Sequence, residues 1–208
     1  MTLSPATSPP ATPTASPPPS PPPSAPELHR WTTAEVEALI ASGALTEDQE
    51  LELLDGLLYR VMPVGPRHSF ATGKLNRLLT RALNDDYTLR VQDPVHLGGT
   101  SRPQSDLYVA RGPEESYVTR LPRAEELLLV VEVADSSIDA DRGVKLPLYA
   151  EAGVPEYWIV NVGEARLERY TQPRDDGKFG VGEVLAEADT LQHPLLGAVP
   201  VGALFANE

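Results

Sequence analysis

Runs of apolar residues with two different periods divide the chain into predicted strands and helices. The run LLLVVEVA, residues 127–134, is apolar on both faces, which is typical of a central strand with helices above and below it. Apolar residues recur at helical spacing over residues 67–84, which predicts a helix there. Alternating apolar and polar residues predict strands at YTLRVQ (87–92) and SDLYVA (105–110). Two further strands are expected at EYWIVN (156–161) and RLERYT (166–171).

Capping and turn residues mark two elements near the start of the domain. In TTAEVEALIASG, Thr32 and Glu35 have the spacing of a capping box and Gly43 marks an end, so this segment is predicted to be a helix. In LELLDGLLYRV, two short apolar runs flank Asp55 and Gly56, which is a strong signal for a β-hairpin.

The second half of the chain adds one more helix and several strands. A helix is expected over residues 139–152, ended by Gly153, with Ser136 and Ser137 as its caps. Short strands and turns are expected over residues 178–205. The order of the elements predicts a mixed α/β (α+β) fold, in which helices flank a central sheet.

Composition divides the chain into two parts. Residues 1–26 hold eleven of the 22 prolines and no charged side chain, so we expect an extended polyproline II tail without a packed core. Residues 27–208 have the length of one ordinary domain. The sequence does not identify what the tail binds, and an aromatic-lined groove of another protein is one option.

Composition also excludes classes of site. No apolar run approaches the roughly 18 residues needed to cross a bilayer, so we expect a soluble protein. The absence of cysteine excludes disulfides, zinc–thiolate sites and thiol catalysis. It is compatible with a cytoplasmic enzyme, which is the location that we expect. The net charge of −13 argues against a general nucleic-acid coat protein, because such proteins gain affinity from Lys and Arg on phosphates.

A carboxylate in the predicted central strand is the first candidate for chemistry. Burial of Glu132 costs several kcal/mol unless it is paired, protonated or bound to a metal. Asp106 shares a strand face with Tyr108 and Ala110, and it meets Glu132 if the two strands are neighbours. Crowded carboxylates require a proton or a divalent cation. Alternatively, Asp106 is solvated at the start of its strand and Glu132 pairs with an arginine.

Lys145 is the third candidate. The helix after the Glu132 strand carries it, with Tyr149 one turn later on the same face. An ammonium at the carboxylate pair could orient a water for attack on a phosphodiester, whereas the alternative is a lysine on the helix surface. The combination with Asp106 and Glu132 is more informative than Lys145 alone.

Other polar side chains have less specific patterns. The histidines at positions 29, 68, 96 and 193 lack the spacing of metal ligands, so we expect them to be structural or exposed. Lys74, Arg77 and Arg81 form a basic stripe along the 67–84 helix. This stripe is either a phosphate-contact surface or a solvated face.

Four sequence blocks resemble, in order, those of the Uma-type restriction endonuclease family, which belongs to the PD-(D/E)XK nuclease superfamily. The blocks are LELLDG, RPQSDLYV, LLLVVEVADSS and KLPLYAEAGVPEYWIV, within about residues 45–172. The resemblance implies a restriction endonuclease-like fold, a divalent metal (Mg²⁺ or Mn²⁺), hydrolysis of phosphodiester bonds, with DNA as the expected substrate, and a homodimer.

The resemblance also implies roles for single residues. Asp106 matches the superfamily's first metal-binding acid, and Glu132 matches the second. The superfamily's lysine normally stands two residues after the second acid, where this chain has Ala134. The lysine of this family is instead on the following helix, which here gives Lys145. Because positions 132 and 134 share a strand face, a helix packed over that face could return an ammonium to nearly the same place.

Two further assignments complete the hypothesis. Glu52 matches another acidic position, which either holds a second metal or orients Lys145, and the carbonyl of Val133 joins the metal ligands. The sequence therefore favours a metal-dependent nuclease. One rival is a catalytically silent module of the same fold that binds nucleic acid or protein, as the acidic net charge suggests. The other is a metal-free hydrolase with paired carboxylates, acting for example on a sugar bond.

Overall fold

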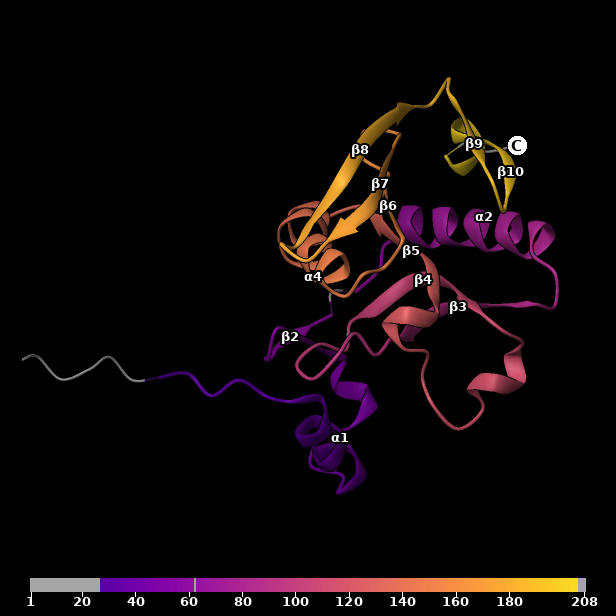
Figure 1. Ribbon diagram of the computed structural model, residues 1–208. Helices are drawn as coiled ribbons and strands as arrows, with labels where there is room; N and C mark the ends of the chain where they lie inside the picture. The colour runs from indigo at the N-terminus through magenta and orange to yellow at the C-terminus, as the bar shows by residue number, and fades with distance from the viewer. Residues whose placement is uncertain (1–26, 62, 206–208) are drawn as a thin grey trace, which may run out of the picture.

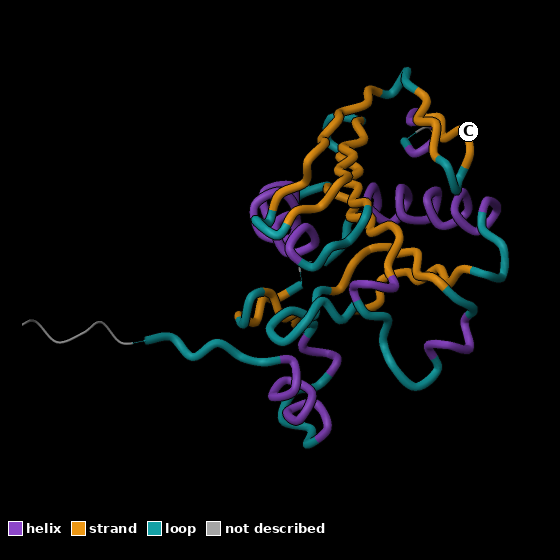
Figure 2. Tube along the Cα trace, viewed as in Figure 1, coloured by secondary structure: helices purple, strands orange, loops and turns teal. Residues whose placement is uncertain are grey.

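A mixed six-stranded sheet forms the centre of the protein, whose computed structural model describes residues 27–61 and 63–205 (Figures 1 and 2). Neighbouring strands are antiparallel except β5 and β6, which run parallel. The predicted mixed sheet, with residues 127–134 as an inner strand, is confirmed. Across the sheet the strands stand in sequence order: β3 (Tyr87–Pro94), β4 (Gln104–Arg111), β5 (Leu127–Ala134), β6 (Glu156–Asn161), β7 (Arg166–Arg174) and β8 (Lys178–Ala186).

A helical crossover joins the two parallel strands, since parallel neighbours need a long connection. It consists of α3 (Ile138–Ala140), the π-turn η4 (Asp141–Lys145) and α4 (Leu146–Glu151). Pro147 accounts for the π-turn, because in a regular helix its ring would clash with the carbonyl four residues back. In the widened turn, the N–H of Leu146 bonds to the carbonyl of Asp141, five residues earlier. The helix expected over residues 139–152 is therefore present with one wide turn.

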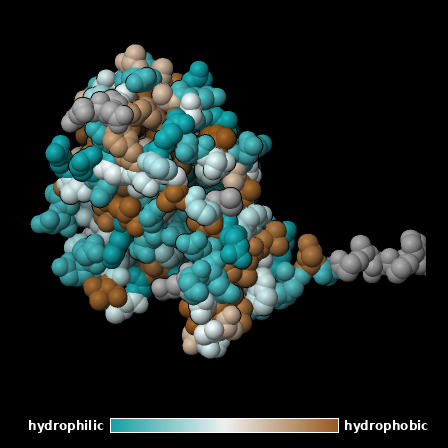
Figure 3. All heavy atoms as spheres, turned by 180° about the vertical axis from the view of Figure 1, so that it is seen from behind, coloured by the Kyte–Doolittle hydropathy of each residue, from teal (hydrophilic) through white to brown (hydrophobic). Residues whose placement is uncertain are grey.

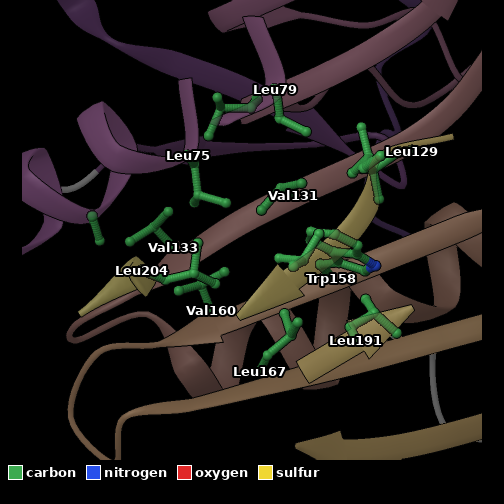
Figure 4. Packing of buried hydrophobic residues seen from close by; sticks show 14 of the residues in the cluster. Leu75, Leu79, Leu129, Val131, Val133, Trp158, Val160, Leu167, Leu191 and Leu204 are labelled. Atoms are coloured by element: carbon green, nitrogen blue, oxygen red, sulfur yellow. The ribbon is translucent and has the colours of Figure 1, made fainter. Parts of the chain in front are cut away.

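Helices cover both faces of the sheet, which explains why β5 is apolar on both sides. On one face, α2 (Pro66–Ala82) packs through Leu75 and Leu79, and a unit near the end of the chain closes over the same core (Figure 4). On the opposite face, Tyr149 of α4 packs in a second cluster that includes Val130. The closing unit consists of β9 (Thr190–His193), β10 (Gly197–Pro200) and the 3-10 helix η5 (Val201–Leu204).

The first helix follows its capping signal. Thr32 is the N-cap of α1 (Thr33–Ala41), and both hydrogen bonds of the capping box with Glu35 are present. The predicted helix is thus confirmed, with Gly43 in the left-handed region just after its end. Three short 3-10 helices lie in connections: η1 (Glu47–Gln49), η2 (Glu114–Tyr117) and η3 (Ala124–Glu126).

The predicted β-hairpin is also present, as a separate two-stranded sheet. It consists of β1 (Leu51–Leu54) and β2 (Leu57–Arg60). Asp55 and Gly56 form its turn, and both have positive φ, as such a tight turn requires. Leu53 exchanges backbone hydrogen bonds with Arg102, just before β4. This contact holds the hairpin beside the main sheet.

The strands after residue 178 differ in part from the expectation. Short strands and turns were expected over residues 178–205, and β9 and β10 are such strands. β8 is longer than expected, with nine residues, eight of which pair with β7. Gly180 and Gly182 interrupt its apolar pattern and hide it in the sequence.

The predicted tail, residues 1–26, lies outside the described residues. Within the described part, no helix is long and apolar enough to span a membrane, and the face in Figure 3 is mostly hydrophilic, with scattered apolar side chains.

Candidate active site

Two adjacent strands bring the candidate carboxylates together. The antiparallel register pairs Leu107 with Val131, so that Asp106 and Glu132 follow on the same face of the sheet. The backbone N–H of Asp106 donates to Oε2 of Glu132 at 3.3 Å, and the N–H of Val133 donates to Oδ2 of Asp106 at 2.8 Å. Both carboxylates line a cavity of about 320 Å³. The predicted convergence of the two strands is therefore present.

The ammonium of Lys145 reaches the same place from the π-turn. Its Nζ lies 3.1 Å from Oε1 of Glu132, 3.3 Å from Oε2 of Glu52 and 3.3 Å from the carbonyl of Gln104. Lys145 is 8% exposed, so the alternative of a surface lysine is wrong, as is the pairing of Glu132 with an arginine. Burial alone would lower the pKa of Lys145, but the negative charges of Glu132, Glu52 and Asp141 outweigh it and raise the pKa. The ammonium stays charged.

Glu132 is a buried acid of the site, with 3% exposure. Besides Lys145, the hydroxyl of Tyr149 donates to its Oε1 at 2.9 Å. Burial raises the pKa of Glu132 well above its usual range, and the charges of Asp106, Asp141 and Glu52 act in the same direction, against the ammonium. One ammonium thus faces several carboxyl groups, those of Glu132, Glu52 and Asp141.

His68, in the first turn of α2, is a site residue that the sequence did not indicate. Its Nε2 lies 3.0 Å from Oδ2 of Asp106, and its Nδ1 lies 3.4 Å from the hydroxyl of Thr72. Burial would lower the pKa of His68, but the hydrogen bond and the charge of Asp106 raise it. No described residue donates a hydrogen bond to Oδ1 of Asp106. The contact joins residues 38 positions apart, so no local spacing could reveal it.

Asp141 is the second residue that sequence reasoning missed. It is 2% exposed, it lines the cavity, and its Oδ2 accepts a hydrogen bond from the hydroxyl of Ser137 at 2.6 Å. Burial raises its pKa, although Lys145 and the Ser137 hydroxyl oppose the shift. Ser137 stands at the N-cap position as expected, but its hydroxyl donates a hydrogen bond to Asp141 and makes none to the backbone of the helix. The spacing of Asp141 and Lys145, four residues apart, was the available signal.

The comparison with known proteins gives the fold and the family. A solved structure described as a putative nuclease belonging to DUF820, from Anabaena variabilis ATCC 29413, superposes with a TM-score of 0.64 at 14% sequence identity. The match covers 84% of this chain and 97% of that one, which shows a common fold. No curated protein matches the chain. The model of the Uma2 family, described as "Putative restriction endonuclease", matches residues 27–200. The chain belongs to this Uma2 family and has its restriction endonuclease-like fold.

Proposed function

We propose that this protein is a metal-dependent nuclease that hydrolyses phosphodiester bonds of DNA, with Asp106, Glu132 and Lys145 as catalytic residues. One observation carries the proposal: the ammonium of Lys145 lies 3.1 Å from the buried carboxylate of Glu132, beside a cavity that Asp106 also lines. A helix thus supplies the lysine ammonium that the superfamily pattern has on the strand, at the position of Ala134. Membership of the family supports the same class of reaction.

The donor atoms of the site suit a small, hard cation such as Mg²⁺ or Mn²⁺. Asp106 and Glu132 offer carboxylate oxygens, and the carbonyl of Val133 faces the same side of β5 as its N–H, which bonds to Asp106. Mg²⁺ usually takes one or two carboxylates and completes its shell with water and substrate phosphates. It therefore does not need three or more ligands from His, Cys, Asp or Glu, and the described residues contain no such group arranged to hold a metal ion. We assign the cation to these three residues.

Each side chain then has a defined task. The chemistry supplied by the cation when bound is polarisation of a phosphoryl oxygen and a lower pKa for water. The ammonium of Lys145 has three N–H donors, so exchange of its contact with Gln104 frees one of them to orient a water in line with the scissile bond. Glu52 holds this ammonium through its ion pair, which supports orientation of Lys145, rather than a second metal, as its role.

A homodimer is the working form that we propose. Cleavage of a duplex requires a cut in each strand, so two copies of the site complete it in one encounter. Light scattering at micromolar concentration should give the mass of a dimer. A monomer mass under these conditions would contradict this part of the proposal and leave the chemistry untouched.

Titration of Mg²⁺ and Mn²⁺ with supercoiled plasmid tests the reaction. We expect nicking that requires the cation and stops on chelation. Lys145→Ala should lose about 10²- to 10⁴-fold in rate while cation binding, measured by calorimetry, survives, because the carboxylates remain. Glu132→Ala should lose both. Lys178, whose side chain is 74% exposed, provides the matched control, and Lys178→Ala should nick at the parental rate.

Two outcomes would change the proposal. Nicking by a folded Lys145→Ala variant at the parental rate would remove Lys145 from the mechanism. Binding of DNA by the parent protein without cleavage at any concentration of either cation would favour the catalytically silent nucleic-acid-binding module. Thermal denaturation of every variant shows whether a loss of rate reflects a loss of fold.

A further inference from the structure

Positive charge is concentrated in one segment of this acidic chain. Residues 56–84 contain five of the 17 Lys and Arg residues and none of the 30 Asp and Glu residues. Asp55 precedes the segment and Asp85 follows it. In a protein of net charge −13, a phosphate polymer is repelled by most of the surface. Any nucleic-acid contact therefore has to be local, and this segment is the place where such a contact is least opposed.

Four of the five cations lie along one side of α2. At about 100° per residue, Arg67, Lys74, Arg77 and Arg81 fall within an arc of roughly 80°, on the side away from the buried Leu75. We call these four residues the α2 basic stripe. At about 1.5 Å per residue, it extends for roughly 21 Å along the helix.

The side chains of the stripe are accessible. Arg67, Arg77 and Arg81 are exposed, and Lys74 lies half-buried with its ammonium 5.4 Å from the ring centre of Phe70. No carboxylate of the described residues lies within ion-pair distance of Arg77 or Arg81. By contrast, many cations elsewhere in the described part are paired with acids, such as those in ion pairs between β6, β7 and β8. The two arginines are thus not neutralised by any acid of the described residues.

One end of the stripe lies at the candidate active site. Gly65, the N-cap of α2, and His68 in its first turn line the same cavity as Asp106 and Glu132. Arg67 reaches towards the cavity wall, with its guanidinium 2.7 Å from the carbonyl of Val162 and 3.6 Å from Asp135. From there α2 runs lengthwise along one side of the sheet (Figure 1). A DNA strand whose scissile phosphate enters the cavity can therefore continue along the α2 basic stripe.

We propose that the α2 basic stripe binds the phosphate backbone of the DNA substrate and holds it in register with the cavity. This inference rests on the proposed function and adds the surface that the substrate uses. One strand of a duplex carries a phosphate every 3.4 Å along the axis, so a stripe of roughly 21 Å spans about six phosphates, more than its four cations can neutralise. Backbone contacts of this kind fix position and carry no sequence information.

Fluorescence anisotropy with a labelled duplex tests the stripe separately from the chemistry. The variant Arg77→Gln/Arg81→Gln removes two exposed charges, and the matched control Arg174→Gln/Lys178→Gln removes two at the β7–β8 turn. Each lost phosphate contact lowers the slope of log K against log[salt] by about 0.9, so we expect the first variant to lose nearly 2 units of slope and the control none. The Kd of the Arg77→Gln/Arg81→Gln variant for the duplex at low salt should rise about tenfold or more. In plasmid nicking, KM should rise while kcat is kept, since the catalytic residues are untouched.

The outcomes separate this inference from the proposed function. If the parent protein nicks DNA and the stripe variant keeps its Kd, salt slope and KM, the stripe is a solvated face and the inference is wrong, while the nuclease proposal stands. If the stripe variant loses affinity but the parent never cleaves, the inference stands and the catalytic proposal falls. If the parent binds no DNA at low salt, both fall. All variants should keep the parental melting temperature, because the changed side chains are exposed.

Discussion

Replacement of Lys145 by methionine removes the ammonium from the candidate site and keeps a side chain of similar length. In the folded protein Lys145 is 8% exposed and Glu132 is 3% exposed, so the carboxylate cannot recover its hydration when the ammonium is lost. Removal of one partner of a buried ion pair typically costs about 3–5 kcal/mol. For a domain of this size, 1 kcal/mol lowers the melting temperature by roughly 2–4 °C, so we expect a decrease on the order of 10 °C.

Urea unfolding in the presence of a chelator measures this cost without a contribution from bound cation. The double variant Glu132→Gln/Lys145→Met should be less destabilised than the sum of its two single changes, because it leaves no unpaired charge between these positions. Lys178→Met, at an exposed position, should stay within about 0.5 kcal/mol of the parent. A similarly small effect of Lys145→Met, or additive effects of the two single changes, would refute the argument that this ammonium neutralises a buried carboxylate.

Three further results are expected. Tyr149→Phe removes a donor to the buried Glu132 and should cost about 2 kcal/mol in urea unfolding, where no change would mean that the hydrogen bond adds nothing. Burial would raise the pKa of Glu156, but hydrogen bonds from His193, Arg169 and the Trp158 indole hold it at about 2. Its stabilising contribution should therefore be complete above pH 4.5 and be lost as the pH falls towards 2, so the difference in unfolding free energy between the parent and a Glu156→Gln variant should shrink over that range. Mg²⁺ at about 100 times its Kd should stabilise the parent by about 2.7 kcal/mol, and a thermal-shift assay without any shift would argue against cation binding.

Local signals in the sequence were sufficient for the elements and for the two acids of the sheet. The capping box at Thr32, the Asp55-Gly56 turn and the two apolar faces of residues 127–134 each act over a few residues, and the structure has all three elements. The face shared by Asp106 and Glu132 followed from strand alternation and from the assumption that their strands are neighbours. That assumption is correct because successive strands of this sheet pair with each other.

The remaining parts of the site depend on contacts through space. His68 lies on α2 and contacts Asp106 of β4, 38 residues later in the chain. Nothing in the spacing of the histidines indicates this contact. Asp141 was missed because an acid in the first turns of a helix is usually solvated, whereas the wide turn before Pro147 carries it into the interior. The glycines of β8 concealed the length of that strand.

The sequential order of the strands has a consequence for synthesis of the chain. From β4 onwards, each strand of the six-stranded sheet pairs with the strand made just before it, so the sheet can grow as the polypeptide emerges from the ribosome. The unit of β9, β10 and η5 packs on α2, which is made about 120 residues earlier, a delay of roughly ten seconds at 5–20 residues per second. During that interval, part of the apolar face of α2 has no cover. Truncation before β9 would make this exposure permanent and turn a transient stage of synthesis into an aggregation-prone product.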